Sequence, residues 1–186
     1  MSDNPAAPFL SALLQVGAKK NLTEEEIGRL KAIINRVGYV ESKNTPDAVQ
    51  VVNGGGTGPG RGEFQYEMSG KNGSSATARN QLKKFEKAYG KVDLPQEDRD
   101  ELAKDVPDFS QISQDGQRAV LLAEWVMKTP ADEVGDLARG HIQDKDFWLD
   151  YHWAGHGGDQ AKRAKKGKQW DREMLDYAKQ VGRANP

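Results

Sequence analysis

A stripe of apolar residues along one predicted helix ends in a carboxylate. The stripe consists of Ile27, Leu30, Ile34 and Val37, and the next step of four along the same face reaches Glu41. We therefore expect the Glu41 carboxyl group to face inward. A carboxyl group held against apolar neighbours loses hydration of its charged form and can stay protonated near neutral pH, as a general acid must. Glu41 is the candidate catalytic residue, and a solvated position just past the apolar face is the alternative.

A second group of polar side chains follows a glycine-rich stretch at residues 54–62, which is typical of a loop that lets backbone approach a ligand closely. Apolar and polar residues then alternate from residue 63 to residue 68, which predicts a short extended segment with Glu63, Gln65 and Glu67 on one side. Hydrolysis of a glycosidic bond uses two carboxylates. The candidates for the second one are Glu63, Glu67 and Asp47, although Glu67 is more typical of a polar outer face.

The helix that carries Glu41 has clear start and stop signals. Thr23-Glu24-Glu25-Glu26 forms a capping box, in which the Thr and the last Glu satisfy free amide groups of the first turn. Asn44-Thr45-Pro46 ends the helix, because proline disfavours a helical residue before it. Glu41 is thus placed in the last turn.

The rest of the chain indicates a mainly α fold. One stripe, closed by Gly90, consists of Ala78, Leu82, Phe85 and Tyr89, and the run from Val120 to Val126 predicts the central core helix. Further helices are expected from Asp132 to Arg139 and from Asp144 through Tyr151. Residues 50–68 form the glycine-rich loop or β segment, and the acidic stretch 92–107 is expected on the surface.

We expect one main domain over residues 21–158, an N-terminal arm or small helix over 1–20 with an apolar piece that ends at Gly17, and a basic C-terminal helix over 159–186. The basic residues of this last helix precede Trp170 and are Lys162, Arg163, Lys165, Lys166 and Lys168. They form either a solvated face or a site for anionic wall polymers or phosphate.

Composition excludes several classes of site. The 186 residues contain 27 basic and 28 acidic side chains, so no global field favours nucleic acid or membrane, and no nucleic-acid partner is expected. The chain has no cysteine, which excludes disulfides, thiolate zinc sites and cysteine nucleophiles. We expect no membrane segment and no secretory signal, because no apolar run is long enough and the first residues lack a basic region.

The three histidines, at positions 141, 152 and 156, are candidate metal ligands. His152, Gly155, Gly157 and Asp159 fall at spacings that resemble the His-x-x-Gly-x-Ala-x-Asp pattern of zinc D-Ala-D-Ala carboxypeptidases. That family needs a further histidine on the C-terminal side, and none follows His156. The zinc peptidase is therefore the weaker alternative, and no metal and no cofactor are expected.

Three segments together resemble the soluble lytic transglycosylases and goose-type lysozymes of the lysozyme-like superfamily. Residues 40–49 resemble the Glu-Ser segment that contains their catalytic Glu. Gly62-Glu63-Phe64-Gln65 is similar to their Gly-Leu-Met-Gln element, and Trp153-Ala154-Gly155 to a degenerate form of their Asn-Ala-Gly segment. Arg61-Gly62-Glu63-Phe64-Gln65 also resembles the Gly-Arg-Gly-x-x-Gln loop of plant-type chitinases. Glu63 and Trp153 depart from the transglycosylase pattern.

The resemblance implies a lysozyme-like helical domain that cleaves peptidoglycan between N-acetylmuramic acid and N-acetylglucosamine. Glu41 would act first as acid and then as base. The 6-hydroxyl of N-acetylmuramic acid would attack the anomeric carbon and close a 1,6-anhydro ring. The residues expected to contact substrate are Ser42, Gly62, Phe64, Gln65, Tyr151, His152 and Trp153.

A wall-acting protein without a secretory signal needs another exit route, such as a phage holin or packaging in a virion, so we expect a phage endolysin or a virion-associated protein. The expected location is the virion or the host cytoplasm with delivery to the periplasm or cell wall, and the expected partners are peptidoglycan glycan strands and other virion proteins. A non-catalytic virion structural or assembly component is the alternative.

Overall fold

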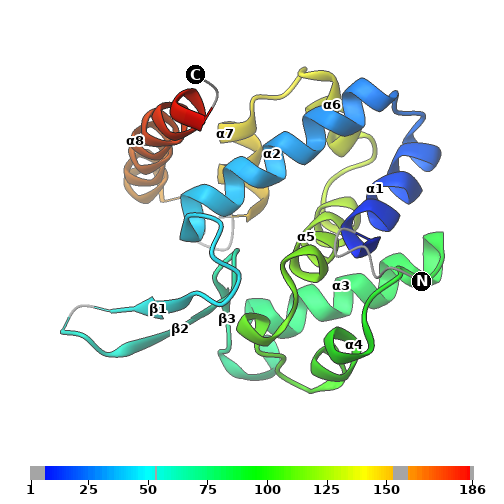
Figure 1. The fold of residues 1–186 in the computed structure, drawn as a ribbon, viewed down its shortest axis with the longest axis horizontal. Helices are drawn as coiled ribbons and strands as arrows, with labels where there is room; N and C mark the ends of the chain where they lie inside the picture. The colour runs from blue at the N-terminus through cyan, green and yellow to red at the C-terminus, as the bar shows by residue number, and fades with distance from the viewer. Residues whose placement is uncertain (1–6, 53, 153–158, 185–186) are drawn as a thin grey trace.

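The computed structural model describes residues 7–52, 54–152 and 159–184, and over these residues the chain is mainly helical with one small sheet (Figure 1). The α-helices are α1 (Ala7–Lys20), α2 (Glu24–Ser42), α3 (Ser74–Tyr89), α4 (Gln96–Ala103), α5 (Gln114–Lys128), α6 (Glu133–Arg139), α7 (Asp144–Phe147) and α8 (Gln160–Ala184). Single 3-10 turns are η1 (Gly70–Asn72) and η2 (Phe109–Gln111), and η3 (Trp148–His152) is a π-helix.

Helix α2 begins and ends close to the predicted positions. The capping box is confirmed: Thr23 Oγ1 accepts from the Glu26 N–H at 3.3 Å, and Glu26 Oε2 accepts from the Thr23 N–H at 2.7 Å. The helix ends at Ser42, and Lys43 closes it in the left-handed conformation with φ of 61°. The predicted stop at residues 44–46 is therefore only slightly late.

The sheet has the order β1-β2-β3 and is antiparallel, with β1 (Val49–Val51), β2 (Thr57–Arg61) and β3 (Tyr66–Glu67). Much of the predicted loop is thus a β-hairpin, which projects from the helices in Figure 1. The predicted extended segment over residues 63–68 is wrong in its first half, because residues 62–65 form a turn. Gly62 and Gln65 have φ of 74° and 53°, and the Gln65 N–H donates to the Gly62 carbonyl at 3.2 Å.

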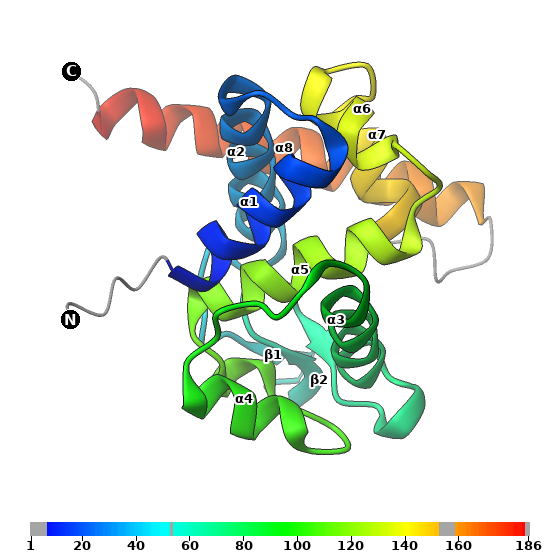
Figure 2. The ribbon, with the colours of Figure 1, turned by 90° about the vertical axis from the view of Figure 1, so that its right-hand side faces the viewer.

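Helix α5 forms the centre of the core, as predicted. Residues 119–123 are fully buried, and α1 and α3 both pack against α5 (Figure 2). The apolar N-terminal piece belongs to this core, since Phe9, Leu13 and Val16 are buried. Its helix α1 continues past the predicted end at Gly17, which packs against the Ile27 side chain.

The stretch 92–107 is not a polar surface excursion. It contains α4, and its apolar residues Val92, Leu94 and Leu102 are buried. The buried Asp98 carboxylate accepts a hydrogen bond from the Ser113 N–H at 2.8 Å, just before α5. The prediction was wrong because acidic residues of this stretch, Asp98 and Glu101, are buried and accept hydrogen bonds from backbone N–H groups, so an acidic composition does not by itself place the stretch on the surface.

After α6, the predicted helix from Asp144 through Tyr151 is divided into α7 and the π-helix η3. Helix α8 packs against α2 and η3. None of the helices in the described parts of the chain is both long and apolar enough to cross a membrane.

Candidate functional site

Glu41 lies in the last turn of α2 with only 9 % of its side chain exposed. Leu30, Ile34 and Val37 on the same face are buried, so the carboxylate faces inward as the stripe predicted. The Trp148 indole N–H donates to Glu41 Oε1 at 2.8 Å. The His152 Nε2 atom lies 3.5 Å from the same oxygen. These contacts fix one carboxylate oxygen and orient the other.

The π-helix η3 supplies both of these contacts. Trp148 and His152 are its first and last residues, and their side chains converge on Glu41 although they are more than 100 positions away in the sequence. Single π turns inside helical segments occur frequently at functional sites. The sequence predicted a helix here, but helical periodicity alone cannot show the wider turn that aims both side chains at one oxygen.

Tyr66 forms another wall of this site. The edge of its ring faces His152, with 6.4 Å between ring centroids, and its hydroxyl donates to Glu124 Oε2 at 2.7 Å. Burial, followed by the Glu124 charge and hydrogen bond and then the Glu41 charge, raises the pKa of Tyr66 well above its usual range. Tyr66 therefore stays a neutral hydrogen-bond donor.

Glu124 was not predicted as a site residue; it is buried and also forms an ion pair with Lys128. Its pattern in the sequence is similar to that of Glu41, a carboxylate among apolar residues of one helix. A single charged residue interrupts the apolar run of α5 between Val120 and Val126. Buried charges of this kind are retained only when they are paired.

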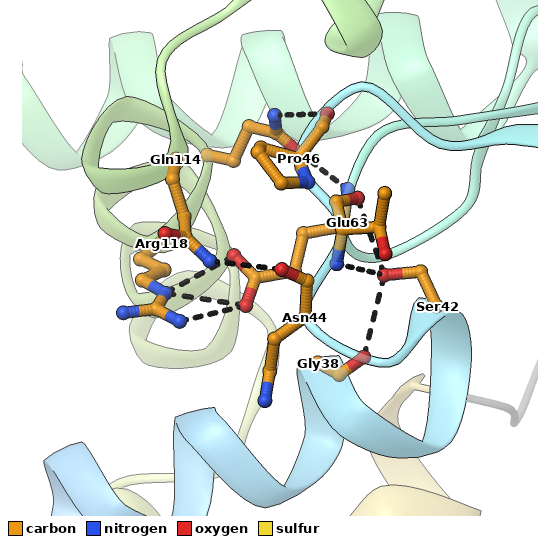
Figure 3. Close-up of polar contacts among 9 residues, drawn as sticks. Gly38, Ser42, Asn44, Pro46, Glu63, Gln114 and Arg118 are labelled. Carbon is orange, nitrogen blue, oxygen red and sulfur yellow. Dashed lines mark hydrogen bonds and ion pairs between the residues drawn. The ribbon is translucent and has the colours of Figure 1, made fainter.

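Glu63 is fully buried in a different place. Arg118 donates to both of its carboxylate oxygens, with 3.0 Å from Nε to Oε2 and 2.8 Å from Nη2 to Oε1 (Figure 3). The carboxylate lies directly over Gly38 of α2, where a Cβ would collide with it. Glu63 thus links the 62–65 turn to α2 and α5. This geometry leaves it no free oxygen for a catalytic role.

The residues around this ion pair connect the end of α2 to α5 (Figure 3). The Gln114 side chain donates to the Asn44 carbonyl at 3.2 Å. The Gln117 amide donates to the Pro46 carbonyl at 2.8 Å and accepts from the Glu63 N–H at 2.6 Å. The Ser42 hydroxyl accepts from the Thr45 N–H at 3.1 Å and donates back to the Gly38 carbonyl at 3.4 Å. Ser42 therefore stabilises the helix end that carries Glu41.

The other predicted site residues differ in burial and in the elements that they contact. Gln65 is half-buried in the turn, with its amide donating to the Gly62 carbonyl at 2.9 Å, and Phe64 is a buried core residue. Glu67 is exposed on β3. Tyr151 points to α6, where its hydrogen bond with Glu133 is the main cause that raises the pKa of Tyr151 to about 12. The structure thus brings His152 to Glu41, but not Tyr151.

Trp153 and the zinc-peptidase pattern through Gly155, His156 and Gly157 lie outside the described residues. Within the described ranges, no three His, Cys, Asp or Glu side chains are grouped so that they could hold a metal ion.

Lys166 of α8 reaches the site from the other side. Its ammonium group lies 6.0 Å from the centroid of the Trp148 ring, whose indole N–H contacts Glu41. Burial lowers the pKa of Lys166, and the Glu41 charge opposes this effect.

Comparison of the sequence with known protein families and with curated proteins, and of the structure with solved structures, finds no match.

Proposed function

We propose that this protein is a peptidoglycan-cleaving glycosidase of the lytic transglycosylase type, with Glu41 as its general acid. The observation that carries the proposal is the setting of Glu41 at the end of α2, where it is largely buried and held through one oxygen. A general acid must be fixed in orientation and shielded from water, and both conditions are met at this position. The resemblance of residues 40–49 and 62–65 to the transglycosylase segments supports the same assignment.

The proposed reaction needs only one carboxylate. Protonated Oε2 donates its proton to the glycosidic oxygen while the bond from that oxygen to the anomeric carbon of N-acetylmuramic acid breaks. The 6-hydroxyl of the same sugar then attacks the anomeric carbon and returns its proton to Oε2. The products are a 1,6-anhydro sugar and a free N-acetylglucosamine 4-hydroxyl, with Glu41 restored. Trp148 and His152 hold Oε1 throughout.

The positions of the other acids favour this route over two-carboxylate hydrolysis. Glu63 is committed to Arg118, and Glu67 is exposed on the sheet. The buried Glu124 carboxylate already accepts from Tyr66 and pairs with Lys128. A hydrolase needs a carboxylate that can activate water or support the anomeric centre across the substrate. Action from the virion or from the host cytoplasm with delivery to the wall remains part of the proposal.

The test is digestion of purified peptidoglycan by the wild type and by Glu41→Gln. We expect 1,6-anhydro-muropeptides from the wild type, identified by mass spectrometry, and a loss of at least about 100-fold in rate for the variant, because general acid catalysis contributes about 10²–10⁴-fold. Glu67→Gln is the matched control and keeps its rate. Reducing-end muropeptides would indicate hydrolysis instead. No release by the wild type would favour the virion structural component.

A further inference from the structure

The first half of α8 is strongly basic on its own. Between Gln160 and Trp170 the helix carries five cations, Lys162, Arg163, Lys165, Lys166 and Lys168, and no acidic residue. Asp159 lies just before the helix, and its carboxylate accepts from the Ala161 and Lys162 N–H groups. Five positive charges therefore follow one another within nine positions.

This arrangement opposes the helix dipole. The N-terminal end of a helix is partly positive, so acidic residues stabilise its first turns and basic residues destabilise them. Helix α8 has no acidic residue in its first turn, and its cations lie toward its N-terminal end. The Asp159 carboxylate caps the first amide groups of α8 and offsets part of this repulsion. It is one negative charge beside five cations, and an anionic ligand would offset more of the repulsion.

One side of the cluster is directed toward Glu41. Glu173 of α8 forms an ion pair with Lys43, two residues after Glu41 in sequence. Lys166 lies seven residues before Glu173, on the same side of the helix and about 10 Å away along its axis. Its ammonium lies 6.0 Å from the Trp148 ring centroid, and the Trp148 indole donates to Glu41. Lys162 lies one further turn back on the same side.

The cations of α8 differ in how they are paired. Arg163 forms an ion pair with Asp150, and Lys162 lies 3.6 Å from the exposed Asp159 carboxylate. Lys165, three residues after Lys162, is exposed and has no ion pair among the residues that the structure describes. Lys168 faces a separate hollow of about 320 Å³ beside Lys145 and is about 160° around the helix from Lys166.

We propose that Lys162, Lys165 and Lys166 form an anion-binding face that holds the peptide-stem carboxylates of the same peptidoglycan strand that is cleaved at Glu41. The inference rests on the proposed function and assigns it a second contact with the substrate. Peptide stems project from each N-acetylmuramic acid, so their carboxylates flank any glycan bond that reaches Glu41. The face is one short side of a helix in a chain of net charge −1, which fits a few carboxylates better than a long row of phosphates.

The test measures binding without cleavage, in the Glu41→Gln background. Lys162→Gln/Lys165→Gln is compared with Lys84→Gln/Lys87→Gln, which removes the same charge at the same spacing from exposed positions on α3. The probe is sacculi stripped of phosphate polymers, either untreated or with their carboxyl groups converted to amides. We expect the first pair to weaken binding to untreated sacculi about tenfold and the control pair less than about twofold. The difference should shrink at about 0.5 M salt and disappear on amidated sacculi.

Several results would overturn the proposal: equal weakening by both pairs, no weakening by the first pair, or the same weakening on amidated sacculi. Tighter binding to DNA or to anionic lipid vesicles than to sacculi at the same salt would also overturn it. Circular dichroism of both double variants checks that the protein keeps its helical content. Because cleavage is absent in this background, the binding result is independent of the digestion that tests Glu41.

Discussion

At the scale of single residues, Tyr66 connects the surroundings of two carboxylates. Its hydroxyl donates to Glu124, and the charge of Glu41 also acts on it. Removal of this hydroxyl leaves one buried oxygen of Glu124 without its donor, while the other oxygen stays paired with Lys128, and an unsatisfied buried acceptor costs free energy. We therefore expect Tyr66→Phe to lower the free energy of unfolding by about 1–3 kcal/mol in urea denaturation at pH 7.

A double-mutant cycle isolates this hydrogen bond. Tyr66→Phe should cost less in a Glu124→Gln background, because a neutral amide loses less than a buried carboxylate when its donor is removed. The control is Tyr89→Phe on α3, expected within about 0.5 kcal/mol of the wild type. An equal cost of Tyr66→Phe in both backgrounds would show that the bond to Glu124 is unimportant.

At the scale of elements, α2 contains two glycines with different surroundings. A Cβ at Gly38 would collide with the Glu63 carboxylate and lie 2.6 Å from Asn44 Oδ1, whereas a Cβ at Gly28 would meet nothing within 4 Å. We expect Gly28→Ala to raise the free energy of unfolding by up to about 1 kcal/mol through helix propensity. Gly38→Ala should lower it by about 1–3 kcal/mol through overpacking. Urea denaturation of both variants checks this, and a gain from Gly38→Ala would contradict the close packing of Glu63 on α2.

The start of the same helix gives a pH-dependent prediction. The hydrogen bond from the Thr23 N–H is the largest cause that lowers the pKa of Glu26 below 4.5. A lowered pKa in the folded state means that the ionised form stabilises the fold, so this contribution is present above pH 4.5 and is lost as pH falls through the folded-state pKa. Glu26→Gln should therefore lower the melting temperature at pH 7 but not at strongly acidic pH. Glu24→Gln, in the same turn, is the control, and a difference that persists in acid would contradict the capping role.

Elements with local signals could be predicted from the sequence, and contacts between distant segments could not. The limits of α2 follow from a capping box and a proline stop, the end of α3 follows from Gly90, and the apolar run at residues 120–126 indicates the buried part of α5 but not its limits. The turn at residues 62–65 could not be predicted, because alternating residues suggested a strand while the Glu63 carboxylate needs Arg118, 55 positions later. The inward direction of Glu41 could be predicted, but its contacts with Trp148 and His152 depend on a π turn that has no sequence pattern.

At the scale of the whole molecule, the site is assembled from elements of very different burial. Glu41 comes from α2, Tyr66 from the sheet, Glu124 from α5, and Trp148 from η3. Helix α5 is fully buried over residues 119–123, whereas α8 has most of its described side chains exposed. Segments with few buried contacts open with a smaller free energy. The side of the site formed by α5 is therefore expected to open with a large free energy, whereas the side formed by α8 is expected to open more easily.

Hydrogen exchange can measure this difference. We expect amides of α8 to exchange at least about 100-fold faster than those of residues 119–123 of α5, because each 1.4 kcal/mol of opening free energy gives a factor of ten. Mass spectrometry of peptic fragments from the native protein gives both rates in one experiment. Equal protection of the two helices would mean that α8 opens only when the whole chain unfolds.

The contact between the Trp148 indole and Glu41 also has a spectroscopic consequence. Indole emission responds to nearby charges, so the fluorescence of Trp148 is expected to respond to the charge of Glu41 at its N–H, together with that of Lys166, which lies 6.0 Å from the ring centroid. The chain has four tryptophans, and two of the others, Trp125 and Trp170, lie within the described core. Replacing the three others with phenylalanine leaves one emitter beside the carboxylate. The protein thus carries an optical probe for the protonation state on which its proposed chemistry depends.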